Sequence, residues 1–284
     1  MIRSQVTAAM AIIPGGSFRL GSDDHYPEER PSRRVEVASF AIDVGPVTNS
    51  AFATFVAATG WMTTAQRLRP AGSAVFAMTP GPVDLARPDQ WWRFVEGAAW
   101  DRPEGSGSTV DDRGDHPVVH VSLEDAEAYA AWAGKRLPTE AEWEVAARGG
   151  LEGATYGWGE DFAPDGVAMA NVWRGAFPWW SEAGTPGPSP VGSWPANGYG
   201  LFDMIGNVWE WTSDRFYQQG RCGCSAPTTG DVRHTLKGGS FLCAGEYCAR
   251  YRPAARIGLT PDTSTAHIGF RCARDLPSRL DSLP

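Results

Sequence analysis

The alternation of apolar and polar residues predicts short strands in the first part of the chain. Residues 12–44 follow this pattern, most clearly at Val35-Glu36-Val37, and the acidic pair Asp23-Asp24 interrupts it. A period of two is typical of half-buried strands, and polar residues between such runs mark turns. We therefore expect several short strands here, separated by an acidic turn.

Three segments have the spacing and end signals of helices. After Thr48-Asn49, apolar residues at Phe52, Phe55 and Val56 line one helical face, and Gly60 is a plausible stop. Ser122 with Asp125 resembles a capping box, and the helix that follows should run to about Trp132.

The third predicted helix begins after Pro138. Thr139 and Glu142 form a capping box, and Gly149-Gly150 should end the helix. The early carboxylates Glu140 and Glu142 also favour the helix dipole. We interpret both as folding signals and give them no catalytic role.

The remaining stretches lack periodicity. Residues 66–115 are rich in Pro, Gly and Asp, yet they contain Trp91-Trp92, Phe94 and Trp100, and disordered segments are poor in aromatic residues. Beyond Gly150 the pattern predicts short strands and turns without a long helix. We therefore expect an α+β fold in a single loop-rich domain, residues 1–284, with little regular secondary structure.

Composition supports this interpretation. The 284 residues include 33 glycines and 22 prolines, which interrupt helices and strands, and 13 tryptophans. Each tryptophan buries a large apolar area while its N–H seeks a partner. A domain with few regular elements can build its core from such rings, so we expect most of them to be buried.

Charge and hydropathy limit the partners. The formal net charge of −8 argues against a nucleic-acid partner, which needs a positive surface. The N-terminus from Met1 to Val6 has no apolar run of signal-peptide length, and no segment approaches the roughly twenty apolar residues that span a bilayer. We expect an unexported protein with no membrane partner.

The candidate chemistry lies at Cys243 and Cys248, behind the turn Gly238-Gly239-Ser240. Residues five apart lie roughly 140° apart on a helix and on opposite faces of a strand, so neither element brings them together. A bend at Ala244-Gly245 can do so, and glycine tolerates positive φ angles. Two thiolates are soft ligands, and soft ligands select Cu(I).

From the residues alone, three other interpretations of this pair stay open. The thiols can form a structural disulfide, remain inert in the core, or bind zinc together with Cys222 and Cys224. The spacing is not that of a Cys-x-x-Cys motif. Cys222-Gly223-Cys224 can face one way on a strand and chelate a metal, but two loop thiols are the simpler interpretation.

The segment around the cysteine pair resembles the active-site region of the formylglycine-generating enzymes, also called sulfatase-modifying factors. Gly238-Gly239-Ser240-Phe241-Leu242-Cys243 and Cys248, with Arg250-Tyr251-Arg252, match that motif. Further blocks follow in the family's order: Ile13–Phe18, Trp91-Trp92, Asp115–Val118, Trp132–Glu144, Asn197–Leu201, Gly206–Trp211 and Gly269–Cys272. Most of these blocks mark a wider superfamily, and only the cysteine pair separates the formylglycine-generating branch.

The resemblance implies a fold and an activity. The fold is the sulfatase-modifying fold, a relative of C-type lectin domains. The activity is oxidation by dioxygen of a cysteine in a Cys-x-Pro-x-Arg segment to formylglycine, which activates sulfatases. Cys243 and Cys248 would hold Cu(I), with a position open to the substrate thiolate, since closed sites are structural. The partner would be a sulfatase, or another protein with the motif, in an unfolded or nascent form.

The resemblance also suggests supporting residues. Ser240 would hydrogen-bond a substrate or oxygen species, although a role in its turn is equally plausible. Trp209 and Arg250 are candidates for shaping the peptide groove, with a scaffold role as the alternative. Many members carry His and Ser between the cysteines, whereas this chain has Ala244, Gly245 and Glu246, which bears on substrate preference.

Calcium is the second cofactor that the resemblance implies, in a structural role. One site maps onto Asp203, Gly206, Val208 and Glu210, where carboxylate and carbonyl oxygens suit a hard cation. The other maps onto Asn171 and Val172, but the acidic stretch that completes it is shortened here. Either Glu182 substitutes for the family's aspartate or this second site is lost.

Secreted relatives in this family carry structural disulfides. The matching positions here hold Ala130, Ala147 and Pro253, and only Cys272 remains, in what resembles a structural position. Five cysteines in total leave at least one unpaired within the chain. Loss of the partners fits a reducing compartment, so we expect a cytoplasmic protein.

Two rival functions remain. Iron-dependent sulfoxide synthases use a similar domain but need a histidine cluster. The five histidines here, His25, His116, His120, His234 and His267, are scattered, and Pro117 spoils a helical pairing of His116 with His120. The other rival is a non-catalytic peptide- or carbohydrate-binding module on the same scaffold, since fold does not fix function. Such a module has no need of Ser240 with both cysteines.

Overall fold

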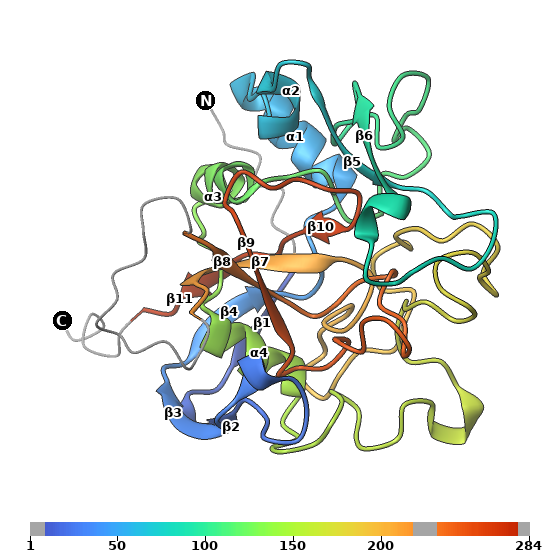
Figure 1. Cartoon of the computed structure of the whole chain (residues 1–284). Helices are drawn as coiled ribbons and strands as arrows, with labels where there is room; N and C mark the ends of the chain where they lie inside the picture. Colours follow the sequence, from blue (N-terminus) through green and yellow to red (C-terminus); the bar gives the residue numbers. More distant parts are fainter. Residues whose placement is uncertain (1–8, 218–231, 278–284) are drawn as a thin grey trace.

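A four-stranded sheet lies at the centre of the computed structural model, which describes residues 9–217 and 232–277 (Figure 1). Its order is β10 (Ile268–Gly269), β7 (Trp209–Arg215), β8 (His234–Lys237) and β9 (Arg256–Leu259). The β10–β7 pair is parallel and the other two pairs are antiparallel. This sheet carries the segment before the two cysteines on β8 and the segment after them on β9.

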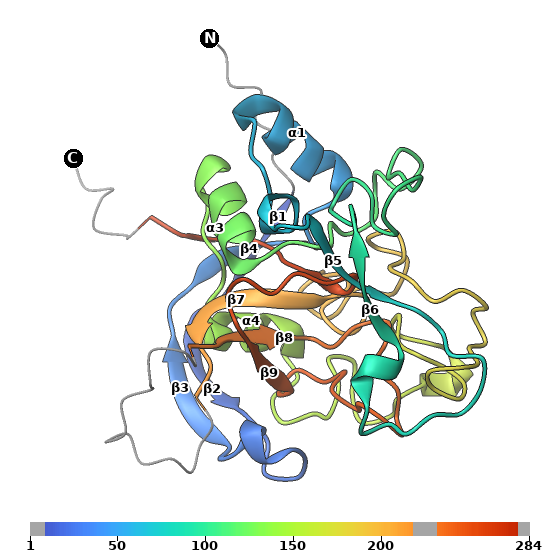
Figure 2. The same cartoon turned by 45° about the horizontal axis from the view of Figure 1, so that its top comes forward.

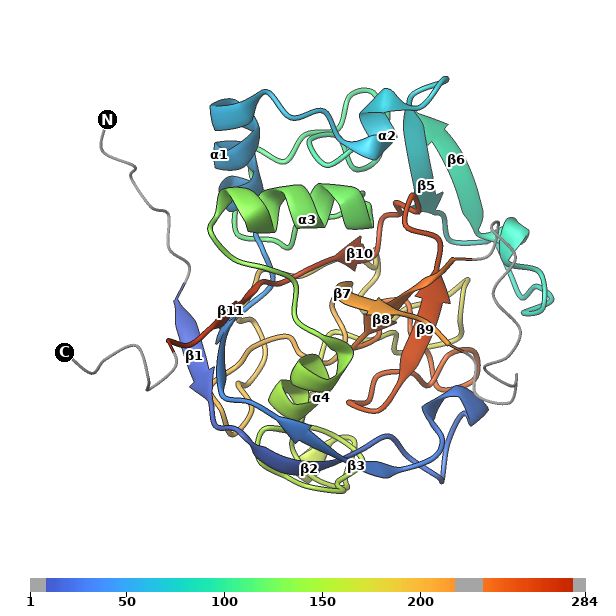
Figure 3. The same ribbon diagram turned by 90° about the vertical axis from the view of Figure 1, so that its left-hand side faces the viewer.

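Smaller sheets surround the central one. A three-stranded sheet has the order β1 (Met10–Ile13), β4 (Phe40–Asp43) and β11 (Ala273–Asp275), so the two ends of the described chain meet on β4. The hairpin of β2 (Gly16–Leu20) and β3 (Arg33–Val37) completes the strands predicted for residues 12–44. Figure 3 shows α3 on one side of the central sheet and α4 on the other.

The helices begin and end where the local signals predicted. In α1 (Asn49–Thr59) the Thr48 hydroxyl accepts from the Ala51 amide, and Gly60 ends the helix in the left-handed region. Both predicted capping boxes form, before α3 (Leu123–Trp132) and α4 (Glu140–Arg148). A fourth helix, α2 (Thr64–Arg67), is one turn long and was not predicted.

Residues 66–115 are ordered, as their aromatic residues predicted, but they are less irregular than expected. They contain a hairpin of β5 (Gly72–Phe76) and β6 (Trp92–Glu96), visible beside α1 in Figure 2. Trp91 is 1% exposed and anchors this region to the core. The hairpin was missed because 15 residues separate its strands, which is too long for a turn signal.

Short 3-10 turns and long loops make up the rest. The turns are η1 (Pro27–Glu29), η2 (Pro88–Gln90) and η3 (Pro164–Gly166). In Figure 1 the loops of residues 150–206 form the side of the molecule opposite α3 and β11, and they carry no strand or α-helix. The prediction of a loop-rich α+β fold with little regular structure is confirmed.

Six of the 13 tryptophans are buried in the core, fewer than expected, and the N–H groups of Trp100 and Trp173 have no acceptor. Trp143 donates to a Glu210 oxygen at 2.7 Å, and Trp211 donates to the Val121 carbonyl at 3.1 Å. Both rings are completely buried. Trp132, Trp179 and Trp180 are exposed, the last two on the loop side.

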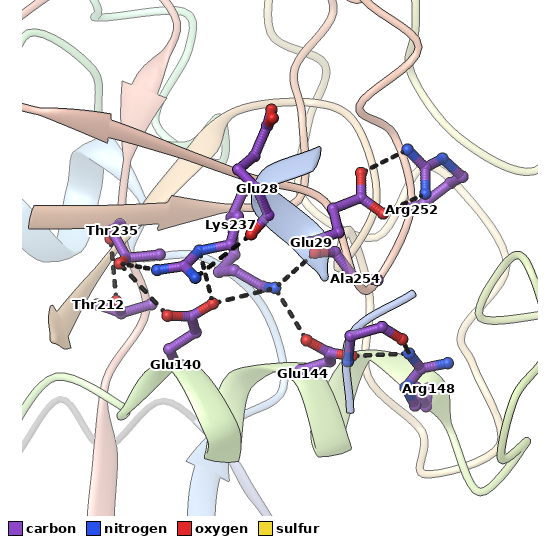
Figure 4. A network of polar contacts seen from close by, with 12 residues as sticks. Glu28, Glu29, Glu140, Glu144, Arg148, Thr212, Thr235, Lys237, Arg252 and Ala254 are labelled. Carbon is purple, nitrogen blue, oxygen red and sulfur yellow. Dashed lines mark hydrogen bonds and ion pairs between the residues drawn. The ribbon is translucent and has the colours of Figure 1, made fainter. Parts of the chain in front are cut away.

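A buried lattice of ion pairs joins α4 to the strands on either side of the cysteines (Figure 4). Lys237, with 0% exposure, lies 3.0 Å from Glu144 and donates to the Ala254 carbonyl. The other Glu144 oxygen accepts from Arg148 at 2.7 Å. Burial raises the pKa of Glu144, but Lys237 and Arg148 together hold it below its ordinary value. The carboxylate therefore stays charged inside the protein.

Among the described residues, no helix has the length and apolar character needed to cross a bilayer.

Replacing Lys237 tests how much the buried ion pairs contribute to the stability of the fold. We expect Lys237→Met to lower the free energy of unfolding by about 3 kcal/mol, because it leaves a buried carboxylate with less charge compensation. The control is Arg34→Met, which breaks an exposed pair with Glu152 and should cost less than about 1 kcal/mol. Urea denaturation measures the free energy of unfolding of both variants. An equal loss in the two would show that the buried Lys237 contributes no more to stability than the exposed Arg34.

His120 should make stability depend on pH. Burial lowers its pKa from 6.5 to about 4, so its stabilising contribution is complete above pH 6.5 and is lost as the pH falls toward 4. We expect the free energy of unfolding to fall by about 2 kcal/mol from pH 7 to pH 5 through this residue. In His120→Asn the loss of about 2 kcal/mol between pH 7 and pH 5 should disappear. If the free energy of unfolding depends on pH as in the wild type, His120 does not cause the loss.

Candidate functional site

The two cysteines meet on one tight turn. Their Sγ atoms lie 3.4 Å apart without a disulfide bond. The amides of Tyr247 and Cys248 both donate to the Ala244 carbonyl, at 3.1 and 2.7 Å, which folds the chain back on itself. The bend lies where it was predicted, although Gly245 does not take a positive φ. A spacing of five thus places both sulfurs on one side.

The Gly-Gly-Ser turn before the pair needs its glycines. Gly238 and Gly239 have φ angles of 97° and 76°. A Cβ on Gly238 would lie 2.9 Å from the Met204 carbonyl oxygen, and one on Gly239 would lie 2.8 Å from that of Arg250. These close backbone approaches let the chain leave β8 and immediately enter the cysteine turn.

The two thiols have opposite electrostatic environments. Burial raises the pKa of Cys243, which is 2% exposed. The pKa of Cys248 falls to about 6, because it accepts a hydrogen bond from the Cys243 thiol and faces the Arg250 guanidinium. Of the two thiols, the half-buried Cys248 is therefore the one that ionises more readily. Thiolate is the form that binds metals.

Arg250 is held beside Cys248 by residues from the N-terminal part of the chain. Its Nη1 lies 3.9 Å from the Cys248 Sγ, and its Nη2 pairs with Glu28 at 2.6 Å. The guanidinium lies over the Tyr26 ring, 3.8 Å from the centroid. Sequence reasoning missed Glu28 and Tyr26, because no local pattern links residues more than 220 positions apart.

The other predicted site residues lie in different places. Ser240 is fully buried, and its amide donates to the Cys243 Sγ at 3.4 Å while its hydroxyl accepts from the Leu242 amide. These contacts fit the turn interpretation and place the serine next to the sulfur. Trp209, suggested for the peptide groove, lies in the core instead and is 2% exposed.

A cavity of about 330 Å³ opens beside the cysteine turn. Aromatic rings line it, with one charged guanidinium; its residues are His25, Tyr26, Pro27, Tyr156, Ala249, Tyr251 and Arg252. Ala249 directly follows Cys248, and its amide donates to the Tyr26 hydroxyl at 3.2 Å. The cavity thus has aromatic walls, and one of its lining residues is the immediate neighbour of Cys248.

The residues expected at the first calcium site fit a cation in part. Asp203 has one buried oxygen without a hydrogen-bond partner, while the other accepts from the Gly192 amide. Burial raises the pKa of Asp203. Both Glu210 oxygens, by contrast, accept from Arg271, at 2.7 and 2.8 Å. A carboxylate has further lone pairs, so Glu210 can still be a ligand, but it already has a cationic partner.

The second expected calcium segment lies against the first. The Asn171 carbonyl accepts from the Asn207 amide at 2.8 Å, and a Cβ on Gly206 would lie 2.4 Å from that carbonyl oxygen. The Asn171 side-chain amide nitrogen donates to the Gly187 carbonyl. Glu182 is exposed and lies 3.6 Å from Arg174, so its carboxylate has an ion-pair partner on the surface.

The described residues contain no iron site of the kind that the rival function needs. All five histidines belong to this part of the chain, which has no group of three or more His, Cys, Asp or Glu side chains able to hold a metal. His120 is buried against Ser73, and His116 pairs with Asp115. The zinc alternative depends on Cys222 and Cys224, which lie outside the described residues.

Comparison with known proteins identifies the family. The family model described as sulfatase-modifying factor enzyme 1-like domain matches residues 2–276. The chain belongs to this family. A formylglycine-generating enzyme of Mycobacterium tuberculosis is 53% identical, over 93% of this chain and 96% of the relative. A mouse member at 42% identity, covering 93% and 85%, is named an inactive Cα-formylglycine-generating enzyme.

A solved structure agrees with this assignment. PvdO from Pseudomonas aeruginosa superimposes with a TM-score of 0.65 at 28% identity, covering 94% of both chains. The predictions of a sulfatase-modifying family and fold are thereby confirmed. Because one relative is named inactive, membership of the family does not by itself establish catalysis in this chain, and the cysteine turn is the part that bears on it.

Arg250 provides a test of the electrostatics in this family member. In the metal-free protein we expect Arg250→Gln to raise the pKa of Cys248 by about one unit, because a neighbouring positive charge favours the thiolate. The pH dependence of alkylation, read at Cys248 by mass spectrometry, measures this. Arg93→Gln on the exposed face of β6 should leave the profile unchanged. An unshifted profile in Arg250→Gln would contradict the role of the guanidinium.

Proposed function

We propose that this protein is a formylglycine-generating oxidase that converts a peptidyl cysteine, in a Cys-x-Pro-x-Arg segment, to formylglycine with dioxygen. The observation that carries the proposal is the pair of sulfurs 3.4 Å apart, one buried and one half-buried. Such a pair suits Cu(I), a soft cation, and Cys243 and Cys248 would hold it. Bound there, Cu(I) would supply the one-electron chemistry that dioxygen requires.

The chain's own residues account for the rest of the site's organisation. Cys243 is enclosed by the core, while Cys248 is only partly buried, so we expect a substrate thiol to approach from the side of Cys248. The hydrogen bond from Cys243 and the nearby Arg250 guanidinium lower the pKa of Cys248, and the Ser240 amide donates to the Cys243 sulfur. The aromatic cavity beside Ala249 would receive the residues that follow or precede the substrate cysteine.

Structural calcium forms part of the proposal. Asp203, Gly206, Val208 and Glu210 would hold one ion, and Asn171 with Val172 would contribute to a second. The support is the unpartnered buried oxygen of Asp203, whose chemistry suits a hard cation. The Asn207 carbonyl between these ligands accepts from the Phe241 amide at 3.0 Å, so the segment also supports the cysteine turn.

The proposed partner is a sulfatase, or another protein with the motif, in an unfolded or nascent form. A folded protein would bury the segment that must enter the cavity. The proposed compartment is the cytoplasm, because the positions of the family's structural disulfides hold Ala130, Ala147 and Pro253, and Cys272 is a free thiol.

Mass spectrometry of a Cys-x-Pro-x-Arg peptide tests this function. After aerobic incubation with the Cu(I)-loaded protein, we expect the mass loss of a thiol-to-aldehyde conversion. Cys243→Ser and Cys248→Ser should each abolish it, because one thiolate cannot replace the pair. Cys272→Ala is the matched control, since it removes a buried thiol outside the turn and should retain conversion.

Two results would contradict the proposal. One is an unchanged peptide when bound copper has been demonstrated, and the other is conversion that persists without Cys243. A protein that binds the peptide with the same affinity with and without Cu(I), and never converts it, would instead be a binding module.

A further inference from the structure

We propose that Glu246 and Tyr247 are positioning residues that fix the cysteine turn by attaching it to the neighbouring loop at Phe177. The proposal goes beyond the proposed function, and only its copper arm depends on that function. It gives a role to the residues between the two cysteines, to which the proposed function assigns none. Many family members carry His and Ser there, whereas this chain has Ala244, Gly245 and Glu246.

Glu246 binds the loop through its side chain. Its Oε1 accepts from the Phe177 amide at 2.9 Å, although Glu246 as a whole is exposed to solvent. An exposed carboxylate that accepts one specific backbone amide loses part of its hydration and its side-chain freedom. The bond therefore links two loops that no helix or strand holds together.

Tyr247 binds the same residue through its ring. It stacks on Phe177 with a centroid distance of 4.6 Å and an angle of 3° between the planes, and Trp91 packs edge-on against both rings. Aromatic pairs contribute about 0.5–1.5 kcal/mol beyond the area they bury. Phe177 is thus held through its backbone amide, by the hydrogen bond to Glu246, and through its ring, by stacking on Tyr247.

The inner end of the cysteine turn is attached to the same loop. The Trp173 amide donates to the Cys243 carbonyl at 3.1 Å, and Ala244 is fully buried. Residues 173–177 therefore run beside residues 243–247 with a contact at each end. The contact at Cys243 lies in the core, whereas the contact at Glu246 lies at the surface.

Within the turn, Glu246 and Tyr247 restrain the outer half that leads to Cys248, whereas Ala249 and Arg250 beyond it are held by Tyr26 and Glu28. The two amides that donate to the Ala244 carbonyl close the turn, and Gly245, with no side chain, leaves it free to open. Cys243 is fixed by the core, so the distance between the sulfurs depends on where residues 246–248 lie. The geometry points to Glu246 and Tyr247 as the residues that set it.

Hydrogen exchange of the metal-free protein tests the inference without copper. We expect Glu246→Ala to raise exchange about three- to tenfold at the amides of Phe177, Tyr247 and Cys248, as loss of one hydrogen bond would do. Glu246→Gln keeps an acceptor oxygen and should stay within about twofold of the wild type. Glu152→Ala removes an exposed acid elsewhere and should change none of these amides.

Tyr247 is tested by the same readout. Tyr247→Phe preserves the stacked ring and should behave as the wild type, whereas Tyr247→Leu should raise exchange across residues 246–248. The melting temperature of every variant is measured in parallel, because a change confined to these amides separates positioning from a general loss of stability.

Cu(I) affinity is the second readout, measured by competition with a chromophoric Cu(I) chelator. We expect Glu246→Ala to weaken binding about three- to tenfold and Glu246→Gln to restore it. Wild-type exchange and affinity in Glu246→Ala, or an equal effect of Glu246→Gln and Glu246→Ala, would overturn the inference. If the wild type binds no Cu(I), the proposed function fails, and the exchange data still decide this inference.

Discussion

The charge of Lys237 is the constraint around which the site is arranged. A fully buried ammonium is costly unless anions and carbonyls surround it, and here Glu144 and the Ala254 carbonyl do so. Lys237 is the last residue of β8 and directly precedes the glycine turn, while Ala254 lies just before β9. The lattice of Figure 4 therefore ties together the two strands between which the cysteine turn is suspended.

Loops take the place of regular elements around this lattice. Backbone hydrogen bonds connect these loops. They join Asn171 to Asn207, Asn207 to Phe241, and Trp173 to Cys243. Each bond satisfies a buried polar group that a sheet or helix would otherwise have paired. Trp173 is buried where these loops meet and packs edge-on against Phe177, so an aromatic cluster joins them in the absence of regular elements.

The sequence predicted those features whose causes are local. Capping boxes at Ser122 and Thr139, and the glycine after α1, fix helix ends through contacts within a few residues. The bend between the cysteines was predictable because a spacing of five permits no straight element. Features built from distant residues were not, since nothing near Arg250 indicates Tyr26 or Glu28, and nothing near Glu210 indicates Arg271. The hairpin of β5 and β6 escaped prediction for the same reason.

The pairing of Arg252 with Glu29 has a consequence for the order in which the protein matures. The two residues lie 223 positions apart, and both are buried with contacts of 2.7 and 2.8 Å. During synthesis, Glu29 cannot meet its partner until residue 252 has been made and has left the ribosome. Contacts of such separation form late, because loop closure must precede them. Cys243 and Cys248 precede Arg252 in the chain, so both thiols are synthesised before this ion pair can form beside their turn.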